Sequence, residues 1–247
     1  MEISRFEQRK QYQDALYFIK SGQRSRYLKI QDQLRTYPLY PYLEYTDKIH
    51  HLSRQSTDSI ITFMEEYQDT PLAAQLLQNW LFNLARRGKW ATFLEHYVKS
   101  PDGRRNACYH GYALYKENHQ EEARAAAEKL WLVGTSQPDE CDPVFKVWRE
   151  NGDLTPDLAW QRFSLAIQAN KQKLATYLVR FLAKKDRQLA TSYKKAHTRP
   201  SEIKRISRYK TQNPHVRDIV LHGIKRLARH QPEEALSTFR QYDEIHS

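Results

Sequence analysis

The sequence has little glycine, cysteine and methionine, and it has no long apolar run. Of its 247 residues, seven are glycine, two are cysteine and two are methionine. Seven glycines are too few for an all-β protein with many tight turns. No stretch approaches the ~18 consecutive apolar residues of a membrane-spanning helix. We therefore expect an all-α chain without a membrane span.

Motifs that carry enzymatic chemistry are also missing. The sequence contains no P-loop, no dinucleotide-binding fingerprint, no GxSxG and no HExxH. Adjacent carboxylates such as Glu65 and Glu66 diverge on a helix, so they do not form the paired acids that sugar chemistry needs. The adjacent His50 and His51 diverge in the same way and cannot readily share a metal ion. We expect no catalytic residue, cofactor or metal site in this chain.

Apolar residues recur at helical spacing throughout the chain. The expected helices cover residues 4–20, 24–36, 40–53, 57–67, 71–87, 89–98, 103–117, 120–133, 141–150, 155–169, 171–183, 186–196, 200–209, 214–229 and 232–244. Three of them begin with an N-cap residue and a proline, at Thr70-Pro71, Thr155-Pro156 and Asn213-Pro214. Four glycines stand at expected helix ends: Gly22, Gly88, Gly134 and Gly152. The pattern predicts antiparallel helix hairpins in an irregular, tetratricopeptide-like α-solenoid, with residues 1–247 as one domain.

The net charge of +11 comes from one part of the chain. Residues 1–170 hold 22 basic and 22 acidic residues, whereas residues 171–230 hold 17 basic and 3 acidic ones. A concentrated positive field attracts polyanions or anionic surfaces, or it packs on an acidic neighbour. Within this stretch, residues 184–212 have few large apolar residues, and we expect a loosely packed helix pair or a partly mobile connection there.

The basic segment supplies candidate contacts for a polyanion or a glycan. They are Lys194, Lys195, Lys204, Arg205, Arg208 and Lys210. Tyr209 lies among them, which suits nucleic acid as well. No helix-turn-helix glycine turn, ribonucleoprotein motif or zinc finger accompanies these charges, so nucleic-acid binding is the second hypothesis.

Two cysteines, Cys108 and Cys141, are the only ones in the chain. In a cytosolic protein they would be two separate buried thiols, and in an exported protein they would form a disulfide. Residues 1–9 have no apolar core of an export signal, and a cleaved signal leaves no trace, so the N-terminus does not decide the compartment. Composition leaves both alternatives open.

A set of short motifs resembles a known family. The run YPLYPYLEY, from Tyr37 to Tyr45, places two prolines and four tyrosines at a helix junction. In the same order follow Leu84-Ala85-Arg86-Arg87 with Trp90, Cys108-Tyr109, Glu121-Glu122-Ala123, Lys129-Leu130-Trp131-Leu132, Ser136-Gln137-Pro138, Cys141-Asp142, Phe145 and Val147-Trp148-Arg149. Together they resemble the N-terminal superhelical domain of the soluble lytic transglycosylases of the bacterial cell wall. The match is dense over residues 5–169 and looser beyond.

The resemblance implies a curved chain of helix hairpins, which in the whole enzyme closes into a ring. It also implies a separate C-terminal, lysozyme-like catalytic domain that cleaves the glycan of murein without hydrolysis, through a single glutamate. The hallmarks of that domain, Glu-Ser, Gly-Leu-Met-Gln and Ala-Tyr-Asn-Ala-Gly, are not in this sequence. The family's domain has cysteines where Cys108 and Cys141 stand, which implies a Cys108–Cys141 disulfide. A periplasmic location is implied as well.

We therefore expect a non-catalytic α-superhelical domain that acts in peptidoglycan turnover. It would guide glycan strands, dock the catalytic domain, or do both, and these two would be its partners. The chain alone would not cleave glycan. A nucleic-acid-binding or protein-scaffolding helical repeat that uses residues 171–230 is the alternative.

Overall fold

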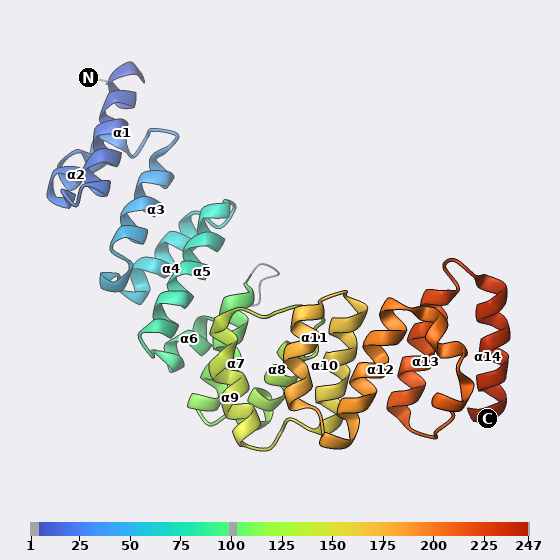
Figure 1. Cartoon of the computed structure of the whole chain (residues 1–247). Coiled ribbons are helices and arrows are strands. Elements are labelled where there is room, and N and C mark those ends of the chain that lie inside the picture. The colour runs from blue at the N-terminus through green and yellow to red at the C-terminus, as the bar shows by residue number, and fades with distance from the viewer. Residues whose placement is uncertain (1–4, 99–102, 247) are drawn as a thin grey trace. The chain divides into compact units, whose positions relative to one another are not determined.

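The computed structural model describes residues 5–98 and 103–246. This part of the chain contains fourteen α-helices joined by short turns and 3-10 helices, and it contains no strand (Figure 1). The expected all-α class is confirmed. None of the helices in these residues has the length and apolar character needed to cross a membrane.

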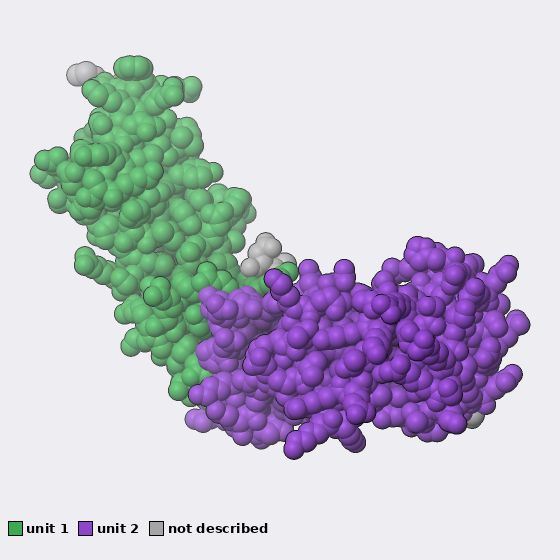
Figure 2. All heavy atoms as spheres, in the orientation of Figure 1, with its two compact units in different colours: residues 1–117 green, residues 118–247 purple. Residues whose placement is uncertain are grey.

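The chain divides into two compact units, Met1–Glu117 and Asn118–Ser247 (Figure 2). The sequence pattern did not predict this division, and the single-domain organisation stays a prediction. Unit 1 holds α1 (Arg5–Lys20), α2 (Arg24–Ile30), α3 (Tyr40–His50), α4 (Thr57–Glu66), α5 (Pro71–Arg86), α6 (Trp90–His96) and α7 (Arg104–Lys116). Unit 2 holds α8 (Gln120–Trp131), α9 (Asp142–Glu150), α10 (Pro156–Gln168), α11 (Gln172–Leu178), α12 (Arg187–Thr198), α13 (Pro214–Leu227) and α14 (Pro232–His246).

Amphipathic helices explain the core of unit 1. In α5, Leu72, Leu76, Trp80 and Leu84 follow one another at intervals of four and are all buried. They therefore form one stripe that faces the interior. α4, α6 and α7 pack against α5 and contribute to the same apolar cluster. A second cluster joins α1, α2 and α3.

The tyrosine-proline run forms a helix junction, as expected. Pro41 lies in the first turn of α3, where its missing N–H costs no hydrogen bond. Tyr40 is buried, and its hydroxyl accepts a hydrogen bond of 2.8 Å from Gln31 Nε2. The rings of Tyr37 and Tyr12 lie 5.3 Å apart, whereas Tyr42 is half-exposed. The junction thus fixes α3 against α1.

Large aromatic side chains fill the core of unit 2. Trp131, Trp148, Trp160, Phe163 and Tyr193 are almost fully buried. The ring centroids of Trp131 and Trp148 lie 5.6 Å apart, and those of Trp160 and Tyr193 lie 5.9 Å apart. Aromatic pairs at such distances contribute beyond their buried area. The tryptophans therefore serve packing within this unit.

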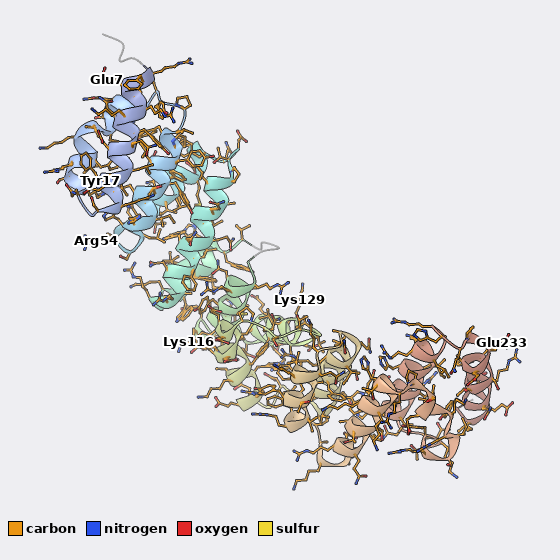
Figure 3. All side chains as sticks on the ribbon, turned by 45° about the horizontal axis from the view of Figure 1, so that its top comes forward. Glu7, Tyr17, Arg54, Lys116, Lys129 and Glu233 are labelled. Atoms are coloured by element: carbon orange, nitrogen blue, oxygen red, sulfur yellow. The ribbon has the colours of Figure 1, made fainter. Side chains whose placement is uncertain are left out.

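Charged residues at helix ends complement the helix dipoles. Lys116 and Lys129 lie in the last turns of α7 and α8, and Glu233 lies in the first turn of α14. Their side chains point away from the helices into solvent (Figure 3). Each such charge stabilises its helix end by roughly 0.3–1 kcal/mol.

One turn geometry recurs along the chain. Five turn residues adopt left-handed backbone angles, with φ between 56° and 81°: Gly22, Gly88, Asn118, Gly152 and Asn170. After α5, the Lys89 amide donates to the Leu84 carbonyl at 3.0 Å, which is the long bond of a Schellman motif. Glycine adopts this conformation without strain, and asparagine tolerates it better than most residues. Gly22, Gly88 and Gly152 thus end helices in this way.

The three expected N-caps have different outcomes. The Thr155 hydroxyl accepts a hydrogen bond from the Leu158 amide, and the Asn213 side chain accepts one from the His215 amide. Thr70 precedes α5, but its hydroxyl donates to the Tyr67 carbonyl at 2.7 Å and does not cap the helix. The predicted start of α5 is confirmed, and the predicted capping hydrogen bond of Thr70 is wrong.

The expected α-helix over residues 200–209 is wrong. Two short 3-10 helices, η6 (Pro200–Lys204) and η7 (Ile206–Arg208), occupy this region. Pro200 keeps Arg199 out of the helical region, and Arg205 interrupts the next turn with a ψ of 70°. Ile203 and Tyr209 are buried, so the segment is anchored. The segment η6 packs on α12 and α13, so the loosely packed helix pair expected here is replaced by one α-helix and short 3-10 helices.

Substitution of Gly134 should destabilise unit 2. A Cβ atom at Gly134 would lie 2.6 Å from the Leu165 carbonyl oxygen, which belongs to the backbone of α10 and cannot easily move. We expect Gly134→Ala to lower the free energy of unfolding by about 1–3 kcal/mol, measured by urea unfolding. Gly22→Asn is the control, because an added Cβ meets nothing within 4 Å there and asparagine tolerates the positive φ. Equal stability of Gly134→Ala and the unmodified chain would contradict this packing.

Both cysteines are buried and disulfide-bonded, and no free cysteine occurs in the described residues. This state agrees with the disulfide expected from the family resemblance. We expect protein prepared under oxidising conditions to take up no alkylating label before reduction and two labels after it, measured by intact mass. A covalent dimer on a non-reducing gel, or two labels without reductant, would contradict a Cys108–Cys141 bond.

Candidate functional site in unit 2

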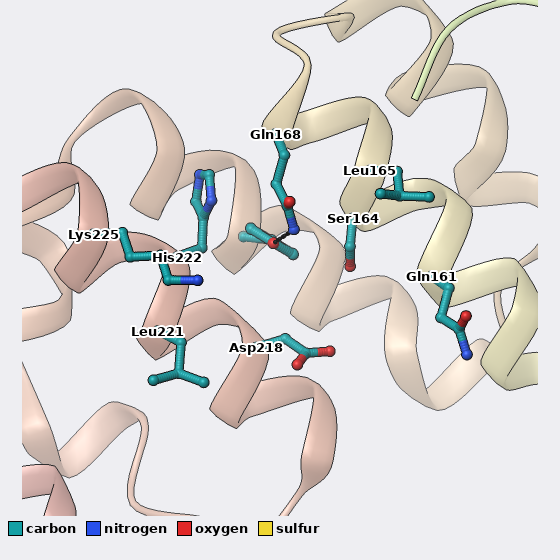
Figure 4. A pocket seen from close by; sticks show the side chains of 9 residues that line it. Gln161, Ser164, Leu165, Gln168, Asp218, Leu221, His222 and Lys225 are labelled. Atoms are coloured by element: carbon teal, nitrogen blue, oxygen red, sulfur yellow. Dashed lines mark hydrogen bonds between the residues drawn. The ribbon is translucent and has the colours of Figure 1, made fainter. Parts of the chain in front are cut away.

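A polar hollow lies between α10, α12 and α13. Its volume is about 330 Å³, which is within the range of small-ligand sites. It is lined by Gln161, Ser164, Leu165 and Gln168 of α10, Tyr193 of α12, and Asp218, Leu221, His222 and Lys225 of α13 (Figure 4). Two of these side chains are leucines, and the other seven all carry hydrogen-bonding groups.

Helical spacing places these polar side chains in two facing rows. Gln161 and Gln168 stand seven residues apart on α10, so they lie on the same face two turns apart. Asp218, His222 and Lys225 follow each other at intervals of four and three on α13, which aligns them in the same manner. The two rows offer amide donors and acceptors, a carboxylate and an ammonium group.

Buried aromatic side chains fix two members of these rows. The Trp160 Nε1–H donates to Asp218 Oδ2 at 2.9 Å, and the Gln168 Nε2 amide donates to the Tyr193 hydroxyl at 3.3 Å. Trp160 and Tyr193 are themselves held in the core. Each surface group therefore has a fixed orientation before any ligand arrives, which reduces the entropy cost of binding.

A chain of two histidines borders the hollow. Asn170 Oδ1 lies 3.2 Å from His197 Nε2, and His197 Nδ1 lies 3.0 Å from His222 Nε2. Because the amide oxygen only accepts, His197 Nε2 carries the proton, and His222 Nε2–H donates to His197 Nδ1. The rings stack at 5.3 Å with an interplanar angle of 9°. Neutral rings satisfy both hydrogen bonds, whereas a second proton on His197 would place two N–H groups opposite each other unless His222 changed its tautomer.

Burial and like charge hold both histidines neutral. Burial first, and then repulsion from His197, Arg226, Lys225 and Arg229, lower the pKa of His222 to about 4. Burial first, and Arg226 second, lower the pKa of His197. We conclude that the ring of His222 presents a neutral polar edge to the hollow at neutral pH.

The six candidate cations do not share one site. Lys204 is paired with Glu234, and Arg205 and Arg208 both lie within 4 Å of Glu202. The Lys194 ammonium donates to the Thr176 hydroxyl at 2.9 Å, and burial lowers its pKa. Lys195 and Lys210 are exposed. Acidic partners thus neutralise part of the positive field, and none of the six lines the hollow.

The residues that do line the hollow were missed by sequence reasoning. Histidine, glutamine and aspartate are separated by up to 61 positions here, from Gln161 to His222, and no motif joins them. The only local sign of this site in the sequence is the spacing of its polar residues. Gln161 and Gln168 stand seven positions apart on α10, and Asp218 and His222 stand four apart on α13. In the described residues, no group of three or more histidine, cysteine or acidic side chains is placed to hold a metal ion.

One family model matches a part of this chain. The Cucumovirus coat protein family matches residues 121–212. This match covers less than half of the chain. The similarities described next cover most of the chain and belong to a different family. The coat-protein match therefore does not define the family of this chain.

Curated relatives match this chain over most of its length. The soluble lytic murein transglycosylase of Escherichia coli K12 is 29% identical over 233 residues, which is 93% of this chain and 36% of the relative. That of Salmonella typhimurium LT2 is 34% identical over 176 residues, which is 70% of this chain and 27% of the relative. The chain thus spans about a third of the length of these relatives.

Solved structures agree with the sequence comparison. An inactive mutant of lytic transglycosylase Slt from Pseudomonas aeruginosa matches with a TM-score of 0.85 and 32% identity, over 95% of this chain and 38% of that one. SLT70 from Escherichia coli matches with a TM-score of 0.76 and 27% identity, over 99% of this chain and 40% of that one. The packed helix hairpins, together with the similarity to these solved structures, show that the chain is an all-α superhelical domain. Within that class, the chain corresponds to the N-terminal superhelical domain of the soluble lytic murein transglycosylases.

The lowered pKa of His222 leads us to predict that the folded chain loses stability in acid. The folded pKa of His222 is about 4 against an ordinary value of 6.5, so below pH 6.5 the unfolded chain gains a proton that the folded chain lacks. We expect the free energy of unfolding to fall between pH 6.5 and 4 by roughly 1–2 kcal/mol, after a discount for the partly exposed ring. Urea unfolding at stepped pH measures this change.

The variant His222→Gln should flatten that pH dependence, because it removes the group that titrates. The control is His230→Gln, which replaces an exposed histidine and should leave the slope unchanged. An unchanged slope in His222→Gln would show that other groups cause the acid sensitivity.

Proposed function

We propose that this chain is a non-catalytic superhelical domain that acts in peptidoglycan turnover, where it guides glycan strands and docks a separate catalytic domain. The observation that carries the proposal is the similarity of almost the whole chain to part of several lytic transglycosylases, at a TM-score of up to 0.85. Cleavage of the glycan would belong to the catalytic domain. The function of the chain is therefore to hold and position.

The hollow on α10 and α13 supports glycan binding. Sugar hydroxyl and acetamido groups both donate and accept hydrogen bonds, and Gln161, Gln168 and Asp218 offer the complementary groups. Lys225 adds a positive charge for the carboxylates that accompany murein. The orientation of Asp218 and Gln168 by core aromatic residues adds preorganisation.

The disulfide-bonded state of Cys108 and Cys141 supports a periplasmic location. Disulfides persist in oxidising compartments, which include the bacterial periplasm. Binding of nucleic acid is not favoured, because Lys204, Arg205 and Arg208 already have acidic partners and the described chain presents no docking element for a groove.

Titration of the isotope-labelled chain tests this function. We expect soluble glycan strands prepared from murein to shift the amide signals of residues on α10 and α13 that line the hollow. A double variant, Gln161→Ala with Lys225→Ala, should weaken binding by roughly 10-fold, because it removes two polar contacts. Lys173→Ala replaces an exposed cation outside the hollow and should bind as the unmodified chain does.

Two further titrations complete the test. Purified catalytic domain of a soluble lytic transglycosylase should shift a separate set of signals. Single-stranded DNA should cause no shift at 0.15 M salt, and a steep salt dependence of DNA binding would favour the alternative function. If neither glycan strands nor the catalytic domain causes any shift, the proposed function is wrong.

A further inference from the structure

A buried arginine in unit 2 has no acidic partner. Arg162 of α10 is 4% exposed, and its guanidinium forms no hydrogen bond or ion pair with the described residues. Arginine is almost never buried to this extent without a counter-charge, because removal of an unpaired charge from water is costly. Burial lowers the pKa of Arg162 to about 10, and the group that opposes this effect is the Tyr177 hydroxyl, not a carboxylate. The charge of Arg162 is therefore uncompensated within the described chain.

Aromatic rings hold this guanidinium in place. Its carbon atom lies 4.3 Å from the centroid of the Trp131 ring of α8 and 5.2 Å from that of the Phe145 ring of α9. The two rings are buried, and their centroids lie 5.3 Å apart in an edge-to-face arrangement. Ring faces attract a cation, but they leave the N–H groups of Arg162 without acceptors. The donors of this side chain are thus held in position and unused.

The unused donors reach the surface at one edge. Nε of Arg162 is shielded from solvent and has no partner in the described chain. The two terminal nitrogens have no partner there either, and they are not fully shielded. Buried polar groups are paired with protein, water or ligand in the great majority of native structures. The small exposed edge of Arg162 therefore indicates a place where one small acceptor group from outside the described chain completes the pairing.

Further donors and positive charge belong to the same cluster. Tyr177 of α11 is 46% exposed, and its hydroxyl lies close enough to Arg162 to influence the pKa of the guanidinium. The Arg180 guanidinium carbon lies 4.2 Å from the centroid of the Tyr177 ring. The neighbouring Phe181 ring, 5.5 Å from that of Tyr177, carries the Arg149 guanidinium carbon at 5.1 Å. None of these three arginines forms an ion pair with the described residues.

The charge of this cluster favours a phosphate group. Guanidinium N–H groups match the geometry of both carboxylates and phosphates. A phosphate monoester carries about −1.5 to −2 charges at pH 7 and offers three acceptor oxygens, whereas a carboxylate or a phosphodiester carries about −1. Three guanidinium groups without an acid favour the ion of higher charge. The exposed Tyr177 hydroxyl adds one more donor for it.

We propose that the edge of unit 2 between α10 and α11 binds a single phosphate group, held by the terminal N–H groups of Arg162 and by the Tyr177 hydroxyl, with Arg180 adding positive charge. The bound group supplies the counter-charge that Arg162 lacks. Arg162, Tyr177 and Arg180 do not line the hollow on α10 and α13, so this is a separate site. It does not depend on the proposed function.

Titration of the full chain with inorganic phosphate tests the site. We expect phosphate to raise the urea midpoint of unfolding in a saturable way, relative to sodium chloride at equal ionic strength, because a ligand of the folded chain stabilises it. The Arg162 Nε–H signal of the isotope-labelled chain should shift over the same concentrations.

Two further probes identify the chemistry of the ligand. Glycerol 3-phosphate tests whether the site accepts a phosphate monoester as well as the free ion. A response to the free ion alone supports a site for inorganic phosphate, and a response to both extends the site to monoesters. Acetate tests the carboxylate, and tighter binding of acetate than of phosphate would overturn the assignment.

Variants assign the contact to named side chains. Arg162→Met should abolish the response to phosphate, and in chloride it should be at least as stable as the unmodified chain, because an uncompensated buried charge is gone. Tyr177→Phe keeps the ring beside Arg180 and should weaken phosphate binding by roughly 5- to 10-fold. Arg187→Met replaces an exposed arginine at the start of α12 and is the control, with a full response expected.

Three results would overturn this inference. One is an equal midpoint in phosphate and chloride, and another is a phosphate response that survives in Arg162→Met. Should Arg162→Met not fold, the third result decides: equal phosphate affinity of Tyr177→Phe and the unmodified chain, with an unmoved Arg162 signal. Glycan titration of the hollow on α10 and α13 is a separate measurement, so failure here leaves the proposed function standing.

Discussion

Burial of helix faces between neighbouring helices is the constraint on which this structure depends. Each α-helix has an apolar stripe that a single neighbour covers only in part, so successive helices must pack on each other. α5 shows this most clearly, because α4, α6 and α7 all pack against it. The core is accordingly spread along the chain, and each unit has its own apolar clusters.

Reversal of the chain between helices depends on a few backbone positions. Left-handed residues at Gly22, Gly88 and Asn170 are each followed by one residue and then the next helix of the same unit. This short connection keeps consecutive helices in contact and brings residues distant in sequence together only through stacking. The basic segment follows a different principle, since buried Ile203 and Tyr209 anchor 3-10 turns there.

Desolvation, more than net charge, shapes the polar sites. Arg162 is 4% exposed and stacks 4.3 Å from the Trp131 ring, and burial lowers its pKa to about 10. The histidines beside the unit 2 hollow are kept neutral for the same reason. By contrast, several cations of the basic segment lie at the surface beside Glu202 and Glu234 and contribute little to a directed field.

The sequence by itself determined the fold class, nearly all helix positions, the turns at Gly22, Gly88 and Gly152, and the family. These features depend on local periodicity, on backbone preferences and on contiguous motifs. Only the tertiary structure decided the pairing of Lys204 with Glu234, the chain from Asn170 through His197 to His222, and the rows that face each other across α10 and α13. Those contacts join residues that lie 25 or more positions apart, and their distances follow from how the helices stack, which no local pattern records.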